Sequence, residues 1–244
     1  MEHINTTEVL GFKVYDASLN DILPIRKLVI NTVNQYSYCV AQKDPVFHKA
    51  LTASDVLLPD GVGITLAARL HQGRIVQKIA GADLHAFALK HLQKNAGSCF
   101  YLGASPETLQ KITAKVAKEY PRVKVGSYSP PYKPQFSEAE SQAMINAVNA
   151  FEPDVLFIGM TAPKQEKWSY EFKDQLQAGY ICAIGAVFDF YAGTVSRPGK
   201  VWQQLGLEWL GRLLKEPKRM FHRYITNGLV FATYLVGRKP KVIS

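Results

Sequence analysis

The order of apolar and polar positions along the chain predicts strands that alternate with helices. Short apolar runs typical of buried strands occupy residues 27–30, 55–58, 98–102, 123–126, 154–160 and 180–184. Helical spacing and helix-start signals mark helices at residues 35–43, 45–52, 62–70, 84–93, 107–119, 137–151 and 163–177. The strands are apolar throughout rather than half polar, which favours a mostly parallel sheet with helices on both faces. The expected fold class is therefore α/β and Rossmann-like.

The sharpest junction in this pattern is a Pro-Asp-Gly turn centred on Asp60. A short apolar run stops at this turn, and a helix rich in small residues begins after it. A carboxylate at the carboxyl end of a strand, beside a helix N-terminus, is well placed for proton transfer or for an anion-binding site. The other interpretation is that Asp60 only caps the helix, because Asp-Gly is good turn chemistry.

Two further strand ends carry polar residues, at residues 31–34 and 161–166. In a parallel sheet the carboxyl ends of all strands share one edge, so these segments and the Asp60 turn can converge on one crevice. Each segment alone has a structural explanation, such as a helix cap or a solvated charge. Their convergence predicts a site that includes Thr32, Asn34, Asp60, Lys164, Gln165 and Glu166.

Composition narrows the class of protein. A chain of 244 residues, 47% of them hydrophobic, can bury a full core, as one α/β domain with an appendage or as two small domains. Its three cysteines, Cys39, Cys99 and Cys182, lie far apart inside apolar runs, which is typical of buried thiols in a reducing compartment. The N-terminal residues lack the pattern of a signal peptide. A cytoplasmic location is expected.

Charge is concentrated at the C-terminal end. Residues 195–244 hold ten Lys and Arg against two Glu, so +8 of the formal net charge of +9 lies there. Such asymmetry indicates an anionic partner for this segment: nucleic acid, an anionic membrane surface or a phosphorylated substrate.

The same segment is also aromatic and predicts two helices, at residues 201–215 and 218–236. Its longest uncharged stretch, residues 224–237, is shorter than the ~20 apolar residues that a membrane-spanning helix needs. Basic, aromatic helices without a span are typical of helices that lie on a membrane surface. The alternative is a helical pair that packs on the domain and exposes a solvated basic face.

Familiar cofactor and metal motifs are missing. Gly61 and Gly63 begin a dinucleotide fingerprint, but Leu66 stands where its third glycine belongs, which argues against a nicotinamide-dependent or flavin-dependent oxidoreductase. No Gly-Lys-Ser or Gly-Lys-Thr is present, so a P-loop is excluded. Asp154 precedes a strand and therefore faces the opposite end of the sheet from the predicted site.

Metal ligands are not expected either. No two histidines have metal-ligand spacing, and His71, His85 and His91 are expected at the surface or its boundary. The sequence also contains no Asp-x-Asp. No metal and no cofactor is expected, and a bound diphosphate would be held by basic side chains or helix N-termini instead of Mg²⁺.

Eight segments, in order, resemble the motifs of the WecG/TagA/CpsF family of bacterial glycosyltransferases, glycosyltransferase family 26. They are INTVN (30–34), AQKDPVF (41–47), LLPDGVGI (57–64), IAGADL (79–84), YLGASPE (101–107), GMTAPKQEKW (159–168), GAVFDFYAG (185–193) and LGLEWLGRLLKEPKR (205–219). Eight ordered matches over nearly the whole chain are specific, whereas any one of them is not.

The resemblance implies an inverting enzyme that moves a sugar from a UDP-sugar to a polyprenyl-diphosphate-linked saccharide. The expected product belongs to a surface polysaccharide: an exopolysaccharide, a capsule or a teichoic-acid linkage unit. The resemblance makes Asp60 the general base and places Thr32 and Gln165 in the same pocket. It implies that other residues of the matched motifs bind substrate: Asn34, Lys78, Asp83, Gly103, Gly159, Lys164, Glu166 and Asp189.

The resemblance also implies a division of the chain into an α/β catalytic domain, residues 1–194, and a helical membrane-associating appendage, residues 195–244. This appendage would bind the membrane surface and the diphosphates through Arg197, Arg212, Arg219 and Arg223. The expected location is the inner face of the cell membrane, with no nucleic acid as partner. Lys78 stands where many members have Arg, so a bidentate contact is lost.

Some questions stay open on the sequence alone. The runner-up function is a peripheral membrane or nucleic-acid-binding protein without catalysis, in which the basic segment is the functional part. No motif identifies the donor sugar, the acceptor or the linkage. A homo-oligomer is compatible with the sequence, which does not fix the oligomeric state.

Overall fold

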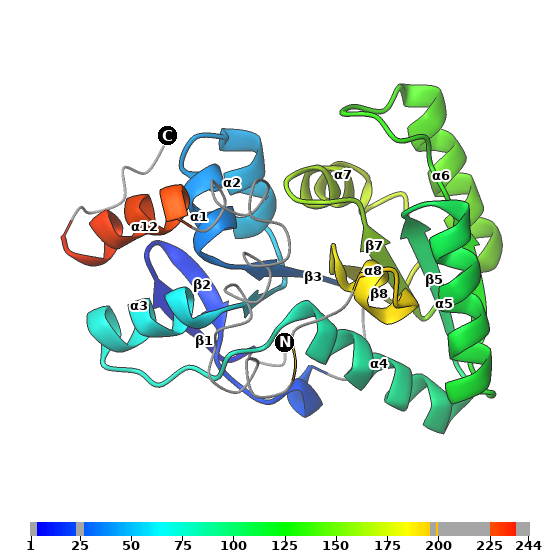
Figure 1. Cartoon of the computed structure of the whole chain (residues 1–244), viewed down its shortest axis with the longest axis horizontal. Helices are drawn as coiled ribbons and strands as arrows, with labels where there is room; N and C mark the ends of the chain where they lie inside the picture. Colours follow the sequence, from blue (N-terminus) through cyan, green and yellow to red (C-terminus); the bar gives the residue numbers. More distant parts are fainter. Residues whose placement is uncertain (1–3, 23–26, 196–198, 200–224, 238–244) are drawn as a thin grey trace.

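The computed structural model describes residues 4–22, 27–195, 199 and 225–237 (Figure 1). The strands are β1 (Thr6–Val9), β2 (Phe12–Tyr15), β3 (Leu28–Val33), β4 (Val56–Pro59), β5 (Ser98–Gly103), β6 (Lys124–Tyr128), β7 (Val155–Gly159) and β8 (Tyr180–Ala183). The helices are the 3₁₀ turn η1 (Leu19–Asp21), α1 (Gln35–Ala41), α2 (Pro45–Thr52), α3 (Val62–Gln72), α4 (Gly81–Asn95), α5 (Pro106–Glu119), α6 (Glu138–Phe151), α7 (Lys164–Phe172), α8 (Val187–Ala192) and α12 (Asn227–Leu235).

A six-stranded sheet, in the order β4-β3-β8-β7-β5-β6, forms the centre of the molecule. Every neighbouring pair in it is parallel, which confirms the predicted α/β fold class. The antiparallel hairpin β1-β2 was not predicted. Its strands are four residues each, and β1 is the half-exposed segment Thr-Thr-Glu-Val, so its hydrophobic signal is weak.

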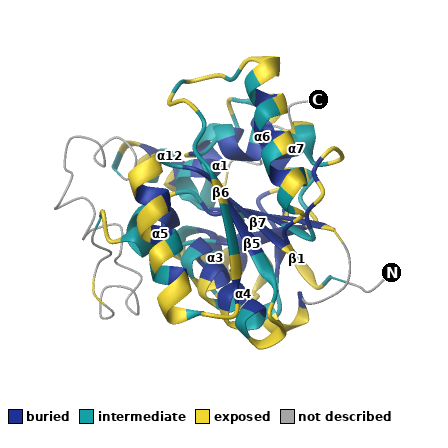
Figure 2. Ribbon diagram, turned by 90° about the vertical axis from the view of Figure 1, so that its right-hand side faces the viewer, coloured by how far each residue is buried: buried dark blue, intermediate teal, exposed yellow. Residues whose placement is uncertain are grey.

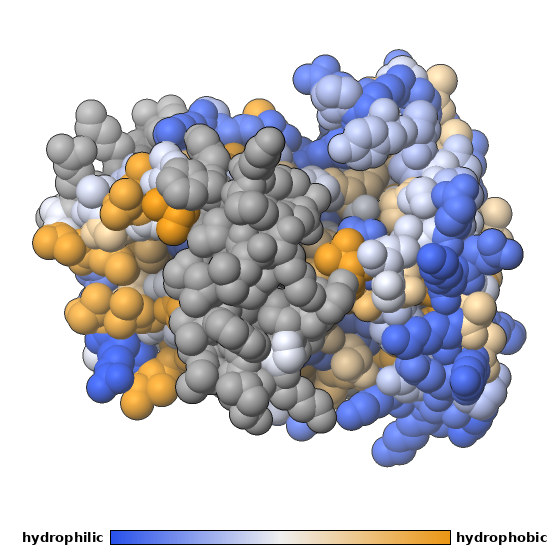
Figure 3. Space-filling view, in the orientation of Figure 1, coloured by the Kyte–Doolittle hydropathy of each residue, from blue (hydrophilic) through white to orange (hydrophobic). Residues whose placement is uncertain are grey.

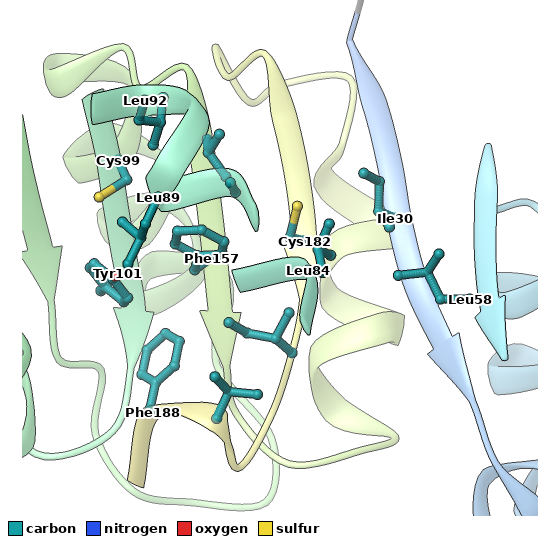
Figure 4. Close-up of a cluster of buried hydrophobic side chains, with 14 of the residues drawn as sticks. Ile30, Leu58, Leu84, Leu89, Leu92, Cys99, Tyr101, Phe157, Cys182 and Phe188 are labelled. Atoms are coloured by element: carbon teal, nitrogen blue, oxygen red, sulfur yellow. The ribbon is translucent and has the colours of Figure 1, made fainter. Parts of the chain in front are cut away.

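Both faces of the sheet are covered, which is why its strands are apolar in consecutive positions. On one face Tyr101, Phe157 and Cys182 pack with side chains of α4, α5 and α8 (Figure 4). On the other face Phe100, Leu156 and their neighbours pack against α6 and α7. Figure 2 shows the result: the inner strands such as β5 and β7 are buried, the edge strand β6 is partly exposed, and the helices turn exposed faces outward.

Most predicted boundaries agree with the structure within a few residues, and two helices differ at one end. The predicted helix at 163–177 ends at Phe172, where Gln175 N donates to the Phe172 carbonyl in a turn. Helix α4 begins at Gly81 rather than 84, and the Asp83 carboxylate accepts from Ala80 N at 2.9 Å.

Helix α12 belongs to the core of the body. Its Phe231 is buried in a cluster with residues of α1, α2, α3 and the hairpin β1-β2. The Phe231 and Tyr38 rings meet edge to face, with centroids 5.5 Å apart. A Cβ on Gly63 of α3 would come within 3.2 Å of the Phe231 ring, so a residue without a side chain allows α12 to lie close to α3.

The remainder of the basic segment lies largely outside the described residues. The residues that are not described include Arg197, Arg212, Arg219, Arg223 and the whole of the predicted helix at 201–215. Within the described part of the chain, no helix is both long and apolar enough to cross a membrane.

The three cysteines are buried free thiols, as predicted, whereas the expectation for His85 was wrong. His85 is buried, and its ring lies against those of Tyr101, Phe157 and Tyr191. Its Nε2 is 2.7 Å from the Tyr101 hydroxyl. Burial, and after it the positive charge of Lys115, lowers the pKa of His85 from 6.5 to about 3.

This pKa predicts a specific loss of stability in acid. The unfolded chain takes up a proton at His85 below pH 6.5, while the native state takes it up only near 3. The free energy of unfolding should therefore fall by up to roughly 1.4 kcal/mol per pH unit between these two values. His85→Gln should remove this contribution in denaturant titrations at several pH values. The control is His91→Gln in the same helix, and equal slopes in both variants would contradict the assignment.

Candidate active site

The carboxyl edge of the parallel sheet opens into one large cleft, with a volume of about 1530 Å³. Its walls are the segments that follow β3, β4, β5, β6, β7 and β8. Strand β4 lies outside β3 at one edge of the sheet and β6 outside β5 at the other, with β8 and β7 between them. Connections that diverge in this way leave a crevice at the carboxyl ends of the strands.

The predicted convergence of distant polar residues is present in this cleft. The residues predicted for the site that line it are Thr32, Asn34, Asp60, Lys78, Gly159, Lys164, Gln165, Glu166 and Asp189. Two do not line it. Asp83 is exposed and caps α4, and Gly103 is buried opposite Gly159 in the β5-β7 register. The four arginines assigned to diphosphate and membrane lie outside the described residues.

Asp60 stands where β4 meets α3. Its neighbour Pro59 is in register with Val33 of β3, and Asp60 N donates to the Val33 carbonyl at 2.9 Å. Gly61, not Asp60, is the N-cap residue of α3, and as a glycine it supplies no capping side chain. Gly61 has φ of +108°, a conformation that favours glycine. The turn thus places the Asp60 backbone beside the end of β3, which carries Thr32.

Gln165 is held firmly at the start of α7. It is buried, its Oε1 accepts from Met160 N at 3.2 Å, and its Nε2 donates to Glu166 Oε1 at 2.9 Å. Gly185, in the loop after β8, lies against the same amide. Two neighbouring strand ends therefore fix the orientation of this side chain in the cleft wall.

Positive electrostatic potential comes from the backbone as well as from side chains. The first residues of α1, α3, α4, α5, α7 and α8 all line the cleft. Free N–H groups at helix N-termini carry partial positive charge and bind phosphate readily. The side chains of Lys78 and Lys164 line the same cleft. Within the described residues, no group of three His, Cys, Asp or Glu could hold a metal ion.

Sequence reasoning missed one wall of the cleft, the segment 129–134 that follows β6. Ser129 Oγ donates to the Ala104 carbonyl at 2.7 Å, and Lys164 Nζ donates to the Lys133 carbonyl at 2.8 Å. The Lys164 ammonium also lies 4.5 Å from the centre of the Phe136 ring. Partial burial lowers the pKa of Lys164. The signal that could have located this wall is a proline-rich segment directly after the carboxyl end of a strand.

In open parallel α/β sheets, ligands bind in the crevice at the carboxyl ends of the strands, which is where this cleft lies. The family model for the glycosyl transferase WecG/TagA/CpsF family matches residues 7–242. The chain belongs to this family. It is accordingly an enzyme, a glycosyltransferase of the hexosyl- or N-acetylhexosaminyl-transferring kind, and the interpretation without catalysis is set aside.

Two curated relatives carry the same name, N-acetylglucosaminyldiphosphoundecaprenol N-acetyl-beta-D-mannosaminyltransferase. The protein from Bacillus subtilis is 30% identical over 191 residues, which are 78% of this chain and 73% of the relative. The protein from Bacillus spizizenii is 25% identical over 179 residues, which are 73% of this chain and 68% of the relative.

The contacts of Lys164 predict that it holds the segment 129–136 in place. Lys164→Ala should speed limited proteolysis by chymotrypsin after Tyr132 by about three- to tenfold, the value of one net hydrogen bond, because the segment would open more often. Lys167→Ala is the matched control, since Lys167 in the same helix pairs with Asp44 instead. Unchanged cleavage in Lys164→Ala would show that other contacts hold this segment.

Proposed function

We propose that the protein transfers an N-acetylhexosamine or hexose from a UDP-sugar to a polyprenyl-diphosphate-linked saccharide, as a step in building a surface polysaccharide. The observation that carries this proposal is the convergence of Asp60, Thr32 and Gln165 on one cleft surrounded by helix N-termini. The names of the two relatives favour N-acetylmannosamine as the sugar and a diphosphate-linked N-acetylglucosamine as the acceptor.

In the proposed reaction, Asp60 is the general base. Its carboxylate takes the proton of an acceptor hydroxyl while that oxygen attacks the anomeric carbon of the donor sugar. The bond between this carbon and the diphosphate oxygen breaks, and UDP leaves with the electron pair. Attack from the face opposite the leaving group inverts the anomeric configuration. Thr32 and the firmly held Gln165 orient the two sugars.

Charge develops on the diphosphate as UDP leaves. We propose that the helix N-termini around the cleft and Lys78, which also lines it, receive this charge without a metal ion. Asn34 contributes to one of these termini, because its side chain caps α1 by accepting from Ser37 N at 3.0 Å. We therefore propose that transfer is independent of divalent metals. Arg197, Arg212, Arg219 and Arg223 would add cations near the same diphosphates.

A polyprenyl-linked acceptor requires that the enzyme work at a membrane. We propose that it acts at the inner face of the cell membrane, held there by the basic residues of segment 195–244. The concentration of +8 of the net charge in that segment supports this proposal.

Replacement of the proposed base should remove transfer and leave the fold intact. We expect Asp60→Asn to lower turnover by about 10²- to 10⁴-fold, the usual contribution of a general base. The measurement is UDP release from a panel of UDP-sugars, with an acceptor carrying N-acetylglucosamine or glucose on a short polyprenyl diphosphate, in the presence of EDTA.

Glu138→Gln, an exposed carboxylate in the first turn of α6, is the matched control and should keep the rate of the unmodified protein. Full turnover by Asp60→Asn would contradict the assignment of the base. Loss of the unmodified enzyme's activity in EDTA would contradict metal independence.

The role of the basic segment is best tested by charge reversal. Deletion of residues 195–244 would also remove α12 and expose Tyr38, whose ring packs on Phe231. Arg212→Glu, Arg219→Glu and Arg223→Glu together should weaken sedimentation with anionic vesicles by roughly tenfold or more, since each basic residue near the surface contributes about 1 kcal/mol.

The control carries the same charge change at three exposed lysines of α4 and α5: Lys94→Glu, Lys111→Glu and Lys118→Glu. Equal sedimentation of the two triple variants would show that these arginines do not bind the membrane.

A further inference from the structure

Helix α3 has an apolar face that points away from the core. Val62, Leu66 and Leu70 are 42%, 46% and 61% exposed. They are spaced by four residues and so lie along one side of the helix. Ile75, just beyond the helix, is 86% exposed. The core-facing side is a different one, formed by Ile64, Ala67 and Ala68.

A surface helix normally turns polar residues to solvent. The outward side of α3 also carries the exposed Arg69, His71 and Gln72. Neither burial in the core nor solubility explains the apolar residues Val62, Leu66 and Leu70 beside them. The face also starts at the proposed reaction centre. Val62 lines the cleft two residues after Asp60, and Leu66 and Leu70 follow one and two turns away. The apolar face therefore leads out of the cleft along α3.

The charged residues of the segment that forms this face are all basic. Residues 61–80 contain Arg69, Arg74 and Lys78 but no Asp or Glu. Arg69 and Arg74 are exposed near the far end of the apolar face. An apolar face with basic residues and no acidic ones complements an anionic lipid surface, where apolar side chains enter the acyl boundary and cations meet phosphates.

Helix α12 extends the apolar surface. It packs beside α3 through Phe231 and Gly63, and its Leu229 and Val236 are 69% and 89% exposed. In Figure 3 the hydrophobic residues gather over α12 and α3 on the left-hand side of the molecule. We define the apolar platform as Val62, Leu66, Leu70, Ile75 and Leu229.

We propose that the apolar platform is a second membrane-contacting surface, which inserts into the interface of an anionic phospholipid bilayer and brings the mouth of the cleft to the lipid. This inference deepens the proposed function, on which it rests. It assigns to α3 a role separate from the arginines of segment 195–244. The platform meets hydrocarbon beside the cleft, so a polyprenyl chain can stay in the bilayer while its sugar reaches Asp60.

The test uses the full chain and reads the environment of single positions. Cys39, Cys99 and Cys182 are buried, so a thiol-reactive, polarity-sensitive fluorophore can be directed to an added cysteine. Leu70→Cys reports on the platform. Val46→Cys is the matched control, since Val46 is an apolar residue of α2, 55% exposed. The probes are vesicles of phosphatidylcholine alone or with phosphatidylglycerol.

With phosphatidylglycerol vesicles, emission from the label at position 70 should shift to shorter wavelength and gain intensity, and that at position 46 should not. In the unlabelled protein, Leu66→Glu with Leu70→Glu should weaken vesicle binding by about tenfold, because binding scales with buried apolar area, and Val46→Glu should not. UDP release with a short-chain acceptor in solution should stay unchanged in both variants.

Three results would overturn the proposal. One is an unchanged spectrum at position 70 while the protein sediments with the vesicles. Another is a spectral shift without vesicles that grows with protein concentration, which would assign the platform to a second copy of the chain. The third is an equal response with and without phosphatidylglycerol. None of these readings involves sugar transfer, so they are separate from a failure of the proposed reaction.

Discussion

All strands of the central sheet run in one direction, and the organisation of the site depends on this constraint. Parallel strands need crossover connections, and here each crossover begins at the carboxyl edge. Polar turns far apart in the sequence therefore meet at that edge, together with the N-termini of the helices that follow. Acidic, amide and hydroxyl side chains and partly positive backbone groups share one cleft without any local motif that encodes it.

The rigidity of the site comes from contacts that join distant segments. Asp60 is tied through its backbone to β3, and Gln165 is bonded to Met160 and Glu166 and packed on Gly185. A catalytic group placed in this way keeps its geometry because the supporting strands are buried on both faces. The wall at residues 129–134 is attached through side chains: Ser129 donates to Ala104, Lys164 donates to the Lys133 carbonyl, and the Lys133 ammonium pairs with Glu140 of α6 at 2.6 Å.

Helix α3 joins three parts of the proposed activity. Its first turn follows Asp60, its inner face contributes to the core, and its outer face is the apolar platform. This arrangement couples the position of the proposed base to the surface that we assign to lipid. Helix α12, which lies within segment 195–244, packs on α1 and α3. Segment 195–244 therefore contributes to the core of the body and also carries most of the net charge.

The sequence by itself determined the parallel α/β class, most element boundaries, the buried cysteines and the residues at the strand ends, because these follow from local periodicity and turn chemistry. Only the tertiary structure decided the strand order, the hairpin β1-β2, and the burial of His85 against Tyr101. It also separated the cleft-lining residues from Asp83 and Gly103, and it showed that Leu66 and Leu70 stay outside the core. These features depend on which distant segment lies opposite each side chain. Hydrophobic pattern records that a residue is apolar, not whether another part of the chain covers it.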